Sequence, residues 1–286
     1  MSASRSPSPY AAVGPAALLF LGVLAVPLAM TVLLSFNAFD SARGIVATRD
    51  FQNYAEVLGD AYFAEIFLRT LRISLTVTAI SVLLGVPEAY ILKRMREPWR
   101  SIFVLVVIGP LLVSVVARTL GWAILLNGNG LLSQALQATH LSAGPVSLMF
   151  TETGVVIGLV HVLVPFMVLS VWASLSRMDT ASERAAESLG AAKLTILRRI
   201  VLPQAVPGIL SGSIVVFSLS ASAFATPAII GGRRLKVAAT LAYDEFLNTL
   251  NWPLGAAVAV LLLVGIVAIV VGWNRFVERR YQQVFA

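Results

Sequence analysis

The chain has 286 residues, of which 58% are hydrophobic and only 12% are charged, and its mean hydropathy is +0.87. These values lie far outside the range of a soluble domain and indicate an integral membrane protein. The chain has no cysteine, which excludes disulfides, zinc–thiolate sites and a thiol nucleophile. The net charge of +7 does not indicate nucleic acid binding, because most basic residues lie in short segments that flank apolar runs.

Six apolar segments follow one another along the chain, each long enough to span roughly 30 Å of hydrocarbon. The first is predicted to be an uncleaved anchor, because its apolar run is too long for the core of a signal peptide. We therefore predict an all-α integral membrane protein with one transmembrane domain over 15–275. A disordered, Ser/Pro-rich N-terminus (1–14) precedes this domain and a basic tail (276–286) follows it. The predicted spans are about 15–36, 71–92, 101–126, 154–175, 206–230 and 253–273.

The distribution of Lys and Arg predicts the orientation of these spans. With six spans the two termini lie on the same side of the membrane. If both are inside, 13 basic residues lie inside and seven outside, leaving out Arg118, which falls within a span. The excess of positive charge marks the cytoplasmic side. It therefore predicts cytoplasmic termini and a cytoplasmic connection at 177–205.

This connection, between the fourth and fifth spans, has strong helical patterning. Thr180 and Glu183 have the spacing of a capping box, in which the hydroxyl and the carboxylate each bond a backbone N–H. The periodicity predicts one short helix with Ala185, Ala186 and Leu189 on one face. Glu183 and two further charged residues, Arg184 and Glu187, are expected to point elsewhere.

The end of this helix and the segment after it are also predicted. Gly190 stands where a helix C-cap needs a positive φ. A second short helix with apolar Leu194 and Leu197 is expected to follow and to lead to Pro203 and Pro207. Small residues on the exposed face of the first helix would allow another protein surface to approach closely.

The same residues carry a family resemblance. Ala185-Ala186, then Gly190, then Ile200-x-Leu202-Pro203 resembles the EAA loop of ATP-binding-cassette (ABC) importer permeases. In that family the loop forms a coupling helix that docks into a groove on the ATPase subunit. The chain departs from the family at Arg184, where a Glu is usual, and the adjacent Glu183 is a candidate to share that role. The alternative interpretation is an ordinary capped surface helix.

The resemblance extends beyond the loop to spermidine/putrescine permeases and their relatives. Three further stretches are similar to that subfamily, and they are spread from the second to the sixth span. The resemblance implies a permease subunit in the bacterial inner membrane that forms half of a solute pathway. It also implies three kinds of partner: a second permease subunit, an ABC ATPase dimer and a periplasmic binding protein. The stretches are Val116–Trp122 with Gly128–Leu131, Phe224–Gly232 with Asn251–Ala257, and Gly85-x-Pro87-x-Ala89-Tyr90.

Few residues could carry chemistry within the spans. Arg118 is either a lining or gate residue of the solute path or, with Trp122 beside it, an anchor that extends to the outer interface. Glu88 is expected to form a helix-end ion pair with Lys93 and Arg94. His161 is expected to be a hydrogen-bonded packing residue rather than a proton relay.

Two acidic residues on the outer side and the absence of an ATP-binding motif narrow the possible functions. Asp244 and Glu245 are candidates for the path of a cationic substrate, although the outer face as a whole is near neutral. There is no phosphate-binding G-x-x-x-x-G-K-[ST] loop, so ATP hydrolysis is expected in a separate subunit. We predict no catalytic residue, cofactor or metal site. The alternatives are an ABC permease for another small solute, an ion-gradient-driven transporter and, more remotely, a membrane-embedded enzyme.

Overall fold

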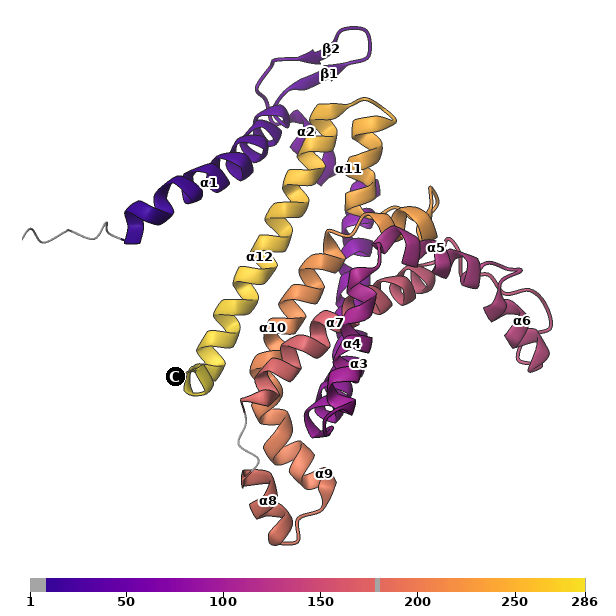
Figure 1. The fold of residues 1–286 in the computed structure, drawn as a ribbon. Helices are drawn as coiled ribbons and strands as arrows, with labels where there is room; N and C mark the ends of the chain where they lie inside the picture. The colour runs from indigo at the N-terminus through magenta and orange to yellow at the C-terminus, as the bar shows by residue number, and fades with distance from the viewer. Residues whose placement is uncertain (1–8, 178–180, 286) are drawn as a thin grey trace, which may run out of the picture. The chain divides into compact units, whose positions relative to one another are not determined.

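The computed structural model describes residues 9–177 and 181–285, and the regular structure of these residues is almost entirely helical (Figure 1). Their one sheet is an antiparallel hairpin of β1 (Ala38–Asp40) and β2 (Gly44–Val46). The helices are α1 (Pro9–Leu34), α2 (Gln52–Gly59), α3 (Ala61–Arg94), α4 (Trp99–Ile108), α5 (Val115–Leu126), α6 (Leu131–Ala138), α7 (Glu152–Ser176), α8 (Ala181–Ser188), α9 (Lys193–Ile196), α10 (Leu202–Ala221), α11 (Ala238–Leu247) and α12 (Trp252–Phe285).

The chain divides into two compact units. One, the hairpin unit, comprises Met1–Ala64 and Leu241–Leu261, and the other, the bundle unit, comprises Glu65–Thr240 and Leu262–Ala286. Helix α1 begins at Pro9, so residues 9–14, which were expected to be disordered, are helical, while residues 1–8 lie outside the described residues. The extent of the predicted single domain at 15–275 stays a prediction.

The hairpin unit orders much of the polar loop that follows the first apolar segment. The side-chain amide of Asn53 donates to the carbonyls of Ser35 and Asn37, both at 2.8 Å. The hydroxyls of Tyr54 and Ser35 are 2.6 Å apart, and the Tyr54 ring packs against Phe36. These contacts hold the start of α2 against the end of α1.

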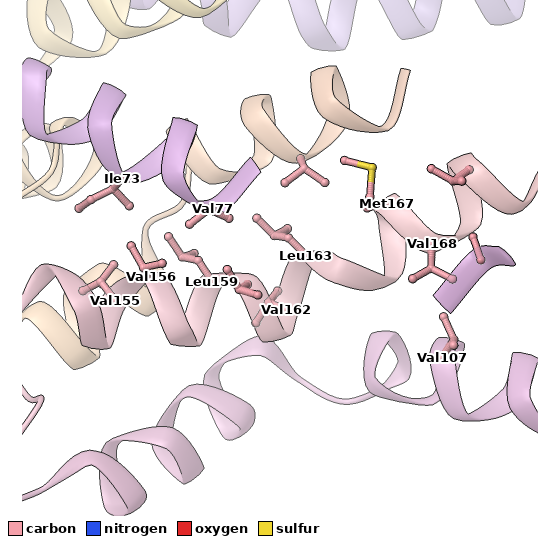
Figure 2. Packing of buried hydrophobic residues seen from close by; sticks show 14 of the residues in the cluster. Ile73, Val77, Val107, Val155, Val156, Leu159, Val162, Leu163, Met167 and Val168 are labelled. Carbon is pink, nitrogen blue, oxygen red and sulfur yellow. The ribbon is translucent and has the colours of Figure 1, made fainter. Parts of the chain in front are cut away.

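Helix α7 is the core of the bundle unit. It begins at a capped end, where the backbone N–H of Gly154 donates to the side chain of Thr151 at 3.1 Å. The helix is apolar and buried on most of its circumference, as expected for a helix with neighbours on several sides. Figure 2 shows Ile73 and Val77 of α3 pointing toward Val156 and Leu159 of α7.

Glycines let α10 lie close to α7. A Cβ added to Gly208 would lie 2.7 Å from the carbonyl oxygen of Ser170, and one added to Gly212 would lie 2.8 Å from the sulfur of Met167. Close backbone approach through small residues is typical of helix pairs in membranes, where dispersion contacts replace the hydrophobic effect between helices. This pair forms the centre of the bundle unit.

Four helices of the described chain are long and apolar enough to cross a membrane: Ala61–Arg94, Glu152–Ser176, Lys193–Ala221 and Trp252–Arg275. A fifth span is possible if the bent pair Trp99–Leu112 and Val115–Ala138 counts as one. In α1 the apolar segment Leu18–Leu34 is shorter than these four helices. The membrane-protein class is confirmed, and the count of six spans stays a prediction.

Two predicted spans are not continuous helices. The segment 101–126 bends by 93° between α4 and α5, because Pro110 lies in a 3₁₀ turn and Ser114 is extended. The segment 206–230 is helical only to Ala221, and a separate π turn at Pro227–Gly231 follows. Apolar composition continued across both breaks, which is why the sequence indicated single spans.

Candidate functional site

The loop between α7 and α10 contains α8, which ends in the conformation predicted at Gly190. The φ of Gly190 is +78°, in the left-handed region. The N–H of Ala191 donates to the carbonyl of Ala186 at 3.0 Å, and that of Gly190 to the carbonyl of Glu187 at 3.0 Å. This is the Schellman pattern, which satisfies carbonyls at the helix end. A Cβ on Gly190 would meet nothing within 4 Å, so the constraint is the backbone conformation and not space.

Glu183 is the anchor of α8. Its side chain is buried, and its two oxygens accept hydrogen bonds from the Lys93 ammonium at 2.9 Å and the Arg94 guanidinium at 2.8 Å. Both cations come from the last turn of α3. Burial raises the pKa of the Glu183 carboxyl, but the hydrogen bonds from Arg94 and Lys93 outweigh it and hold the pKa below its ordinary value. We call this trio the loop clamp.

The loop clamp determines which side of α8 faces the bundle. Glu183, which was expected on a different side of the helix from Ala185, Ala186 and Leu189, faces the bundle, where the two cations at the end of α3 pair with it. Ala186 is partly buried against the core, whereas Ala185 is exposed and Leu189 is 88% exposed. Ala185 and Leu189 thus lie on the exposed side that was expected for the small residues, and Ala186 lies nearer the bundle; a docking role for these residues stays a prediction. Thr180, the proposed partner in the capping box, lies outside the described residues.

The outward surface of α8 consists of Arg184, Ala185, Ser188 and Leu189. It combines a small residue, one cation and an apolar side chain that the chain itself leaves uncovered. Glu187, half exposed, lies 3.9 Å from Arg94 at the edge of the loop clamp. We call this surface the outward face of α8.

The second half of the loop is not a short separate helix. From Lys193 the chain stays helical to Ala221, passing through a π turn at Leu197–Val201. Pro203 removes an amide donor from the carbonyl four residues earlier, at Arg199, and that carbonyl lies within the π turn. The chain therefore passes the proline without a break. Within this stretch Ile200 and Leu202 are partly buried, and Pro203 is exposed.

A second feature of the bundle unit is an open cleft of about 620 Å³ between α3, α4, α5 and α7. Leu84 and Glu88 come from α3, Phe103 from α4, Trp122 from α5 and His161 from α7. Except for Glu88 and His161 the walls are apolar. We call it the four-helix cleft.

The structure corrects two expectations about the cleft residues. Glu88 has no ion pair among the described residues, because Lys93 and Arg94 bind Glu183 instead. His161 has no hydrogen bond among the described residues and is exposed to the cleft, with its ring 5.5 Å from that of Trp122.

Arg118 lies on α5 near this cleft. Two of its side-chain nitrogens, Nε and Nη1, are buried and have no hydrogen-bond partner within the described part of the chain. It lies one helical turn before Trp122 on α5, and the Trp122 ring is 5.5 Å from that of His161. Because the third nitrogen, Nη2, is not among these buried atoms, both the lining role and the interface anchor stay predictions. A role for Arg118 and Trp122 in a solute path stays a proposal.

Asp244 and Glu245 are not part of the four-helix cleft. They lie on α11 in the hairpin unit, near its C-terminal end. Asp244 accepts a hydrogen bond from the side chain of Asn248 at 2.8 Å, and Glu245 accepts one from Thr249 at 2.7 Å. These contacts stabilise the helix end and leave the proposed role in a substrate path untested. No group of three metal-ligating side chains occurs among the described residues.

Sequence reasoning missed the loop clamp and the four-helix cleft. Glu183 and its partners are about 90 positions apart, and no local pattern connects them. The signal that could have suggested the loop clamp was a pair of cations ending one span and a carboxylate in a helix of small residues. The cleft draws on four helices, and only its charged member, Glu88, is visible as unusual in the sequence.

A body of several apolar, membrane-length helices with a loop that presents one short helix is the arrangement of a multi-pass membrane protein. The chain matches the family described as "Binding-protein-dependent transport system inner membrane component" over residues 81–283, and it belongs to this family. It is therefore an ABC importer permease subunit of the inner membrane.

Curated relatives include polyamine permeases. The chain is 31% identical over 239 residues to the spermidine/putrescine transport system permease protein PotB of Salmonella typhimurium (strain SL1344), covering 84% of this chain and 83% of PotB. The PotB of Escherichia coli (strain K12) is also 31% identical, over 84% of this chain and 86% of that protein. The molybdenum transport system permease protein ModB of Mycobacterium bovis is 33% identical over 195 residues, covering 68% and 72%.

Solved structures show the same fold. A bacterial ABC transporter that imports the acidic polysaccharide alginate has a chain with a TM-score of 0.73 at 19% identity, covering 94% of both chains. The MetNI methionine ABC transporter gives a TM-score of 0.58 at 17% identity, covering 77% of this chain and 98% of that one. At these identities the likeness shows the fold alone, and it confirms the predicted importer-permease architecture.

Proposed function

We propose that this chain forms half of the pathway of an ATP-driven importer for a polyamine, which a periplasmic binding protein delivers. The observation that carries the ATP-driven part is the outward face of α8. The loop clamp fixes α8 to the end of α3, while Arg184, Ala185 and Leu189 remain uncovered. Together with the resemblance of this loop to the EAA loop of importer permeases, this uncovered surface supports docking of a separate subunit.

The partners follow from this proposal. An ABC ATPase dimer binds the outward face of α8, a second permease subunit, identical or homologous, completes the pathway, and a binding protein docks on the opposite side. Both termini and the α8 loop are cytoplasmic in this arrangement. The polyamine part is supported by the similarity to the two PotB proteins, which are named as spermidine/putrescine permeases.

The test is purification of the full chain from its native membrane, followed by measurement of ATP hydrolysis and of putrescine uptake in proteoliposomes. The proposal expects an ATPase subunit to copurify and uptake to require ATP. Uptake that follows an ion gradient without ATP would favour the secondary-transporter alternative. Molybdate uptake would favour a different solute, an alternative supported by the similarity to ModB.

Orientation has a separate test. Reporter fusions after Gly128 and after Lys193 are expected to report the periplasm and the cytoplasm, respectively, because the Lys/Arg excess lies on the side of the α8 loop. Fusions at both sites that report the same side would contradict the proposed topology.

A further inference from the structure

The starting observation is an unpaired carboxylate in an apolar wall. Glu88 lines the four-helix cleft and has no hydrogen bond or ion pair to another described residue. Ionisable side chains within membrane-spanning helices are costly and occur where they face a partner or a water-filled path. The two nearest cations along the chain, Lys93 and Arg94, are occupied by Glu183. Glu88 therefore faces the open cleft, where water or a bound solute can interact with it.

The position of Glu88 within the cleft follows from the alignment of α3 and α7. These helices run side by side in the same direction, because Arg72 of α3 donates to Glu152 at the start of α7, and Gly85, further along α3, packs against Met167, further along α7. Glu88 is three residues beyond Gly85, toward the loop clamp, and His161 is six residues before Met167. At a rise of 1.5 Å per residue the two are about 13 Å apart along the helices.

The rest of the cleft suits the body of an amine. Phe103 and Trp122 line it, and aromatic faces attract cations and cover methylene groups. The end away from Glu88 is different, because His161 lies there against the Trp122 ring and Arg118 is one helical turn from Trp122. A cation is therefore attracted to the Glu88 end and repelled from the other.

We propose that the four-helix cleft binds an alkyl amine, with its ammonium group on the Glu88 carboxylate and its methylene chain along the aromatic wall. This inference deepens the proposed function, on which it rests for the amine as cargo. A short diamine keeps both ammonium groups away from Arg118, whereas a long polyamine extends one of them toward it. The site therefore favours putrescine over spermine.

The test uses the full-length chain, purified with the subunits that copurify, and measures binding of radiolabelled putrescine without ATP or binding protein. Glu88→Gln is expected to weaken binding about tenfold or more, because it removes a charge-assisted hydrogen bond. Glu88→Asp is expected to retain part of the affinity. Glu56→Gln is the matched control, since this exposed carboxylate of α2 undergoes the same charge change outside the cleft.

Each outcome decides the inference. Unchanged putrescine affinity in Glu88→Gln, or no measurable binding of putrescine or spermidine by the unaltered protein, overturns it. Loss of the second permease subunit from Glu88→Gln, with putrescine affinity retained, also overturns it and assigns Glu88 to a subunit contact. Glu88-dependent putrescine binding without any copurifying ATPase supports the inference and contradicts the proposed ATP-driven importer. ATP-driven putrescine uptake that is unchanged in Glu88→Gln supports the proposed importer and overturns the inference about Glu88.

Discussion

The loop clamp and the four-helix cleft differ in whether their charged side chains are paired within the described chain. In the loop clamp, the buried carboxylate of Glu183 binds two cations at hydrogen-bond distance. In and beside the cleft, Glu88 has no ion pair and Arg118 has two buried nitrogens without partners among the described residues. Paired charges fix one element to another, whereas an ionisable side chain without a partner inside a membrane protein is a candidate for a functional site.

The largest expected effect comes from breaking the loop clamp. Glu183→Ala removes the carboxylate that binds Lys93 and Arg94, and breaking a buried ion pair typically costs 3–5 kcal/mol. We expect about 3 kcal/mol, the lower end of that range, because Arg94 is 43% exposed. Thermal unfolding should report the loss, and copurification should report an ATPase that is no longer retained.

Glu187→Ala is the control for this change. Glu187 is half exposed and lies 3.9 Å from Arg94, so its loss should cost about 0.5 kcal/mol or less. Equal effects of the two substitutions would show that the loop clamp does not hold α8.

The next effect concerns the turn that ends α8. Gly190→Val forces a β-branched residue to φ +78°, at a cost of about 1–2 kcal/mol. No membrane span changes, so we expect normal amounts of membrane protein that fails to retain its ATPase. Gly59→Val, at a glycine with equal space and no positive φ, should keep ATPase retention. Full transport by Gly190→Val combined with Ala186→Trp would exclude this loop as the coupling element.

A smaller effect of opposite sign is expected at Arg118. Arg118→Met removes buried donors that have no partner in the described chain, so the stability of the protein should rise by up to about 1 kcal/mol. The variant should also bind spermine more tightly relative to putrescine, since the charge near His161 is gone. Arg72→Met should instead lower stability slightly, because Arg72 donates to Glu152. A thermal scan that ranks the two in the other order would contradict the distinction between paired and unpaired charges.

The smallest effect is expected on the outward face of α8. Arg184→Glu restores the residue usual in the family and changes an exposed side chain, so stability should shift by no more than about 0.5 kcal/mol. ATPase retention should be kept or improved, as measured by copurification. Loss of the ATPase would show that Arg184 itself contacts the docking groove.

The sequence predicted what depends on local pattern. The apolar length of α7 and the C-cap glycine at Gly190 were both readable, because each depends on neighbours within one or two turns. The bend near Pro110 and the helix end at Ala221 were not, since apolar composition continues across both breaks. The partners of Glu183 and the cleft around Glu88 depend on tertiary packing, which one sequence does not contain.

One helix end connects the two regions. Glu88 and the cations of the loop clamp lie within the last two turns of α3, and Pro87 directly precedes them inside the helix. Pro87 leaves the carbonyl of Leu83 without its amide donor, so the helix is most easily bent there. The segment after Pro87 carries both the Glu88 carboxylate and the two cations that hold Glu183 of α8. A change in the position of α8 would therefore also displace Glu88.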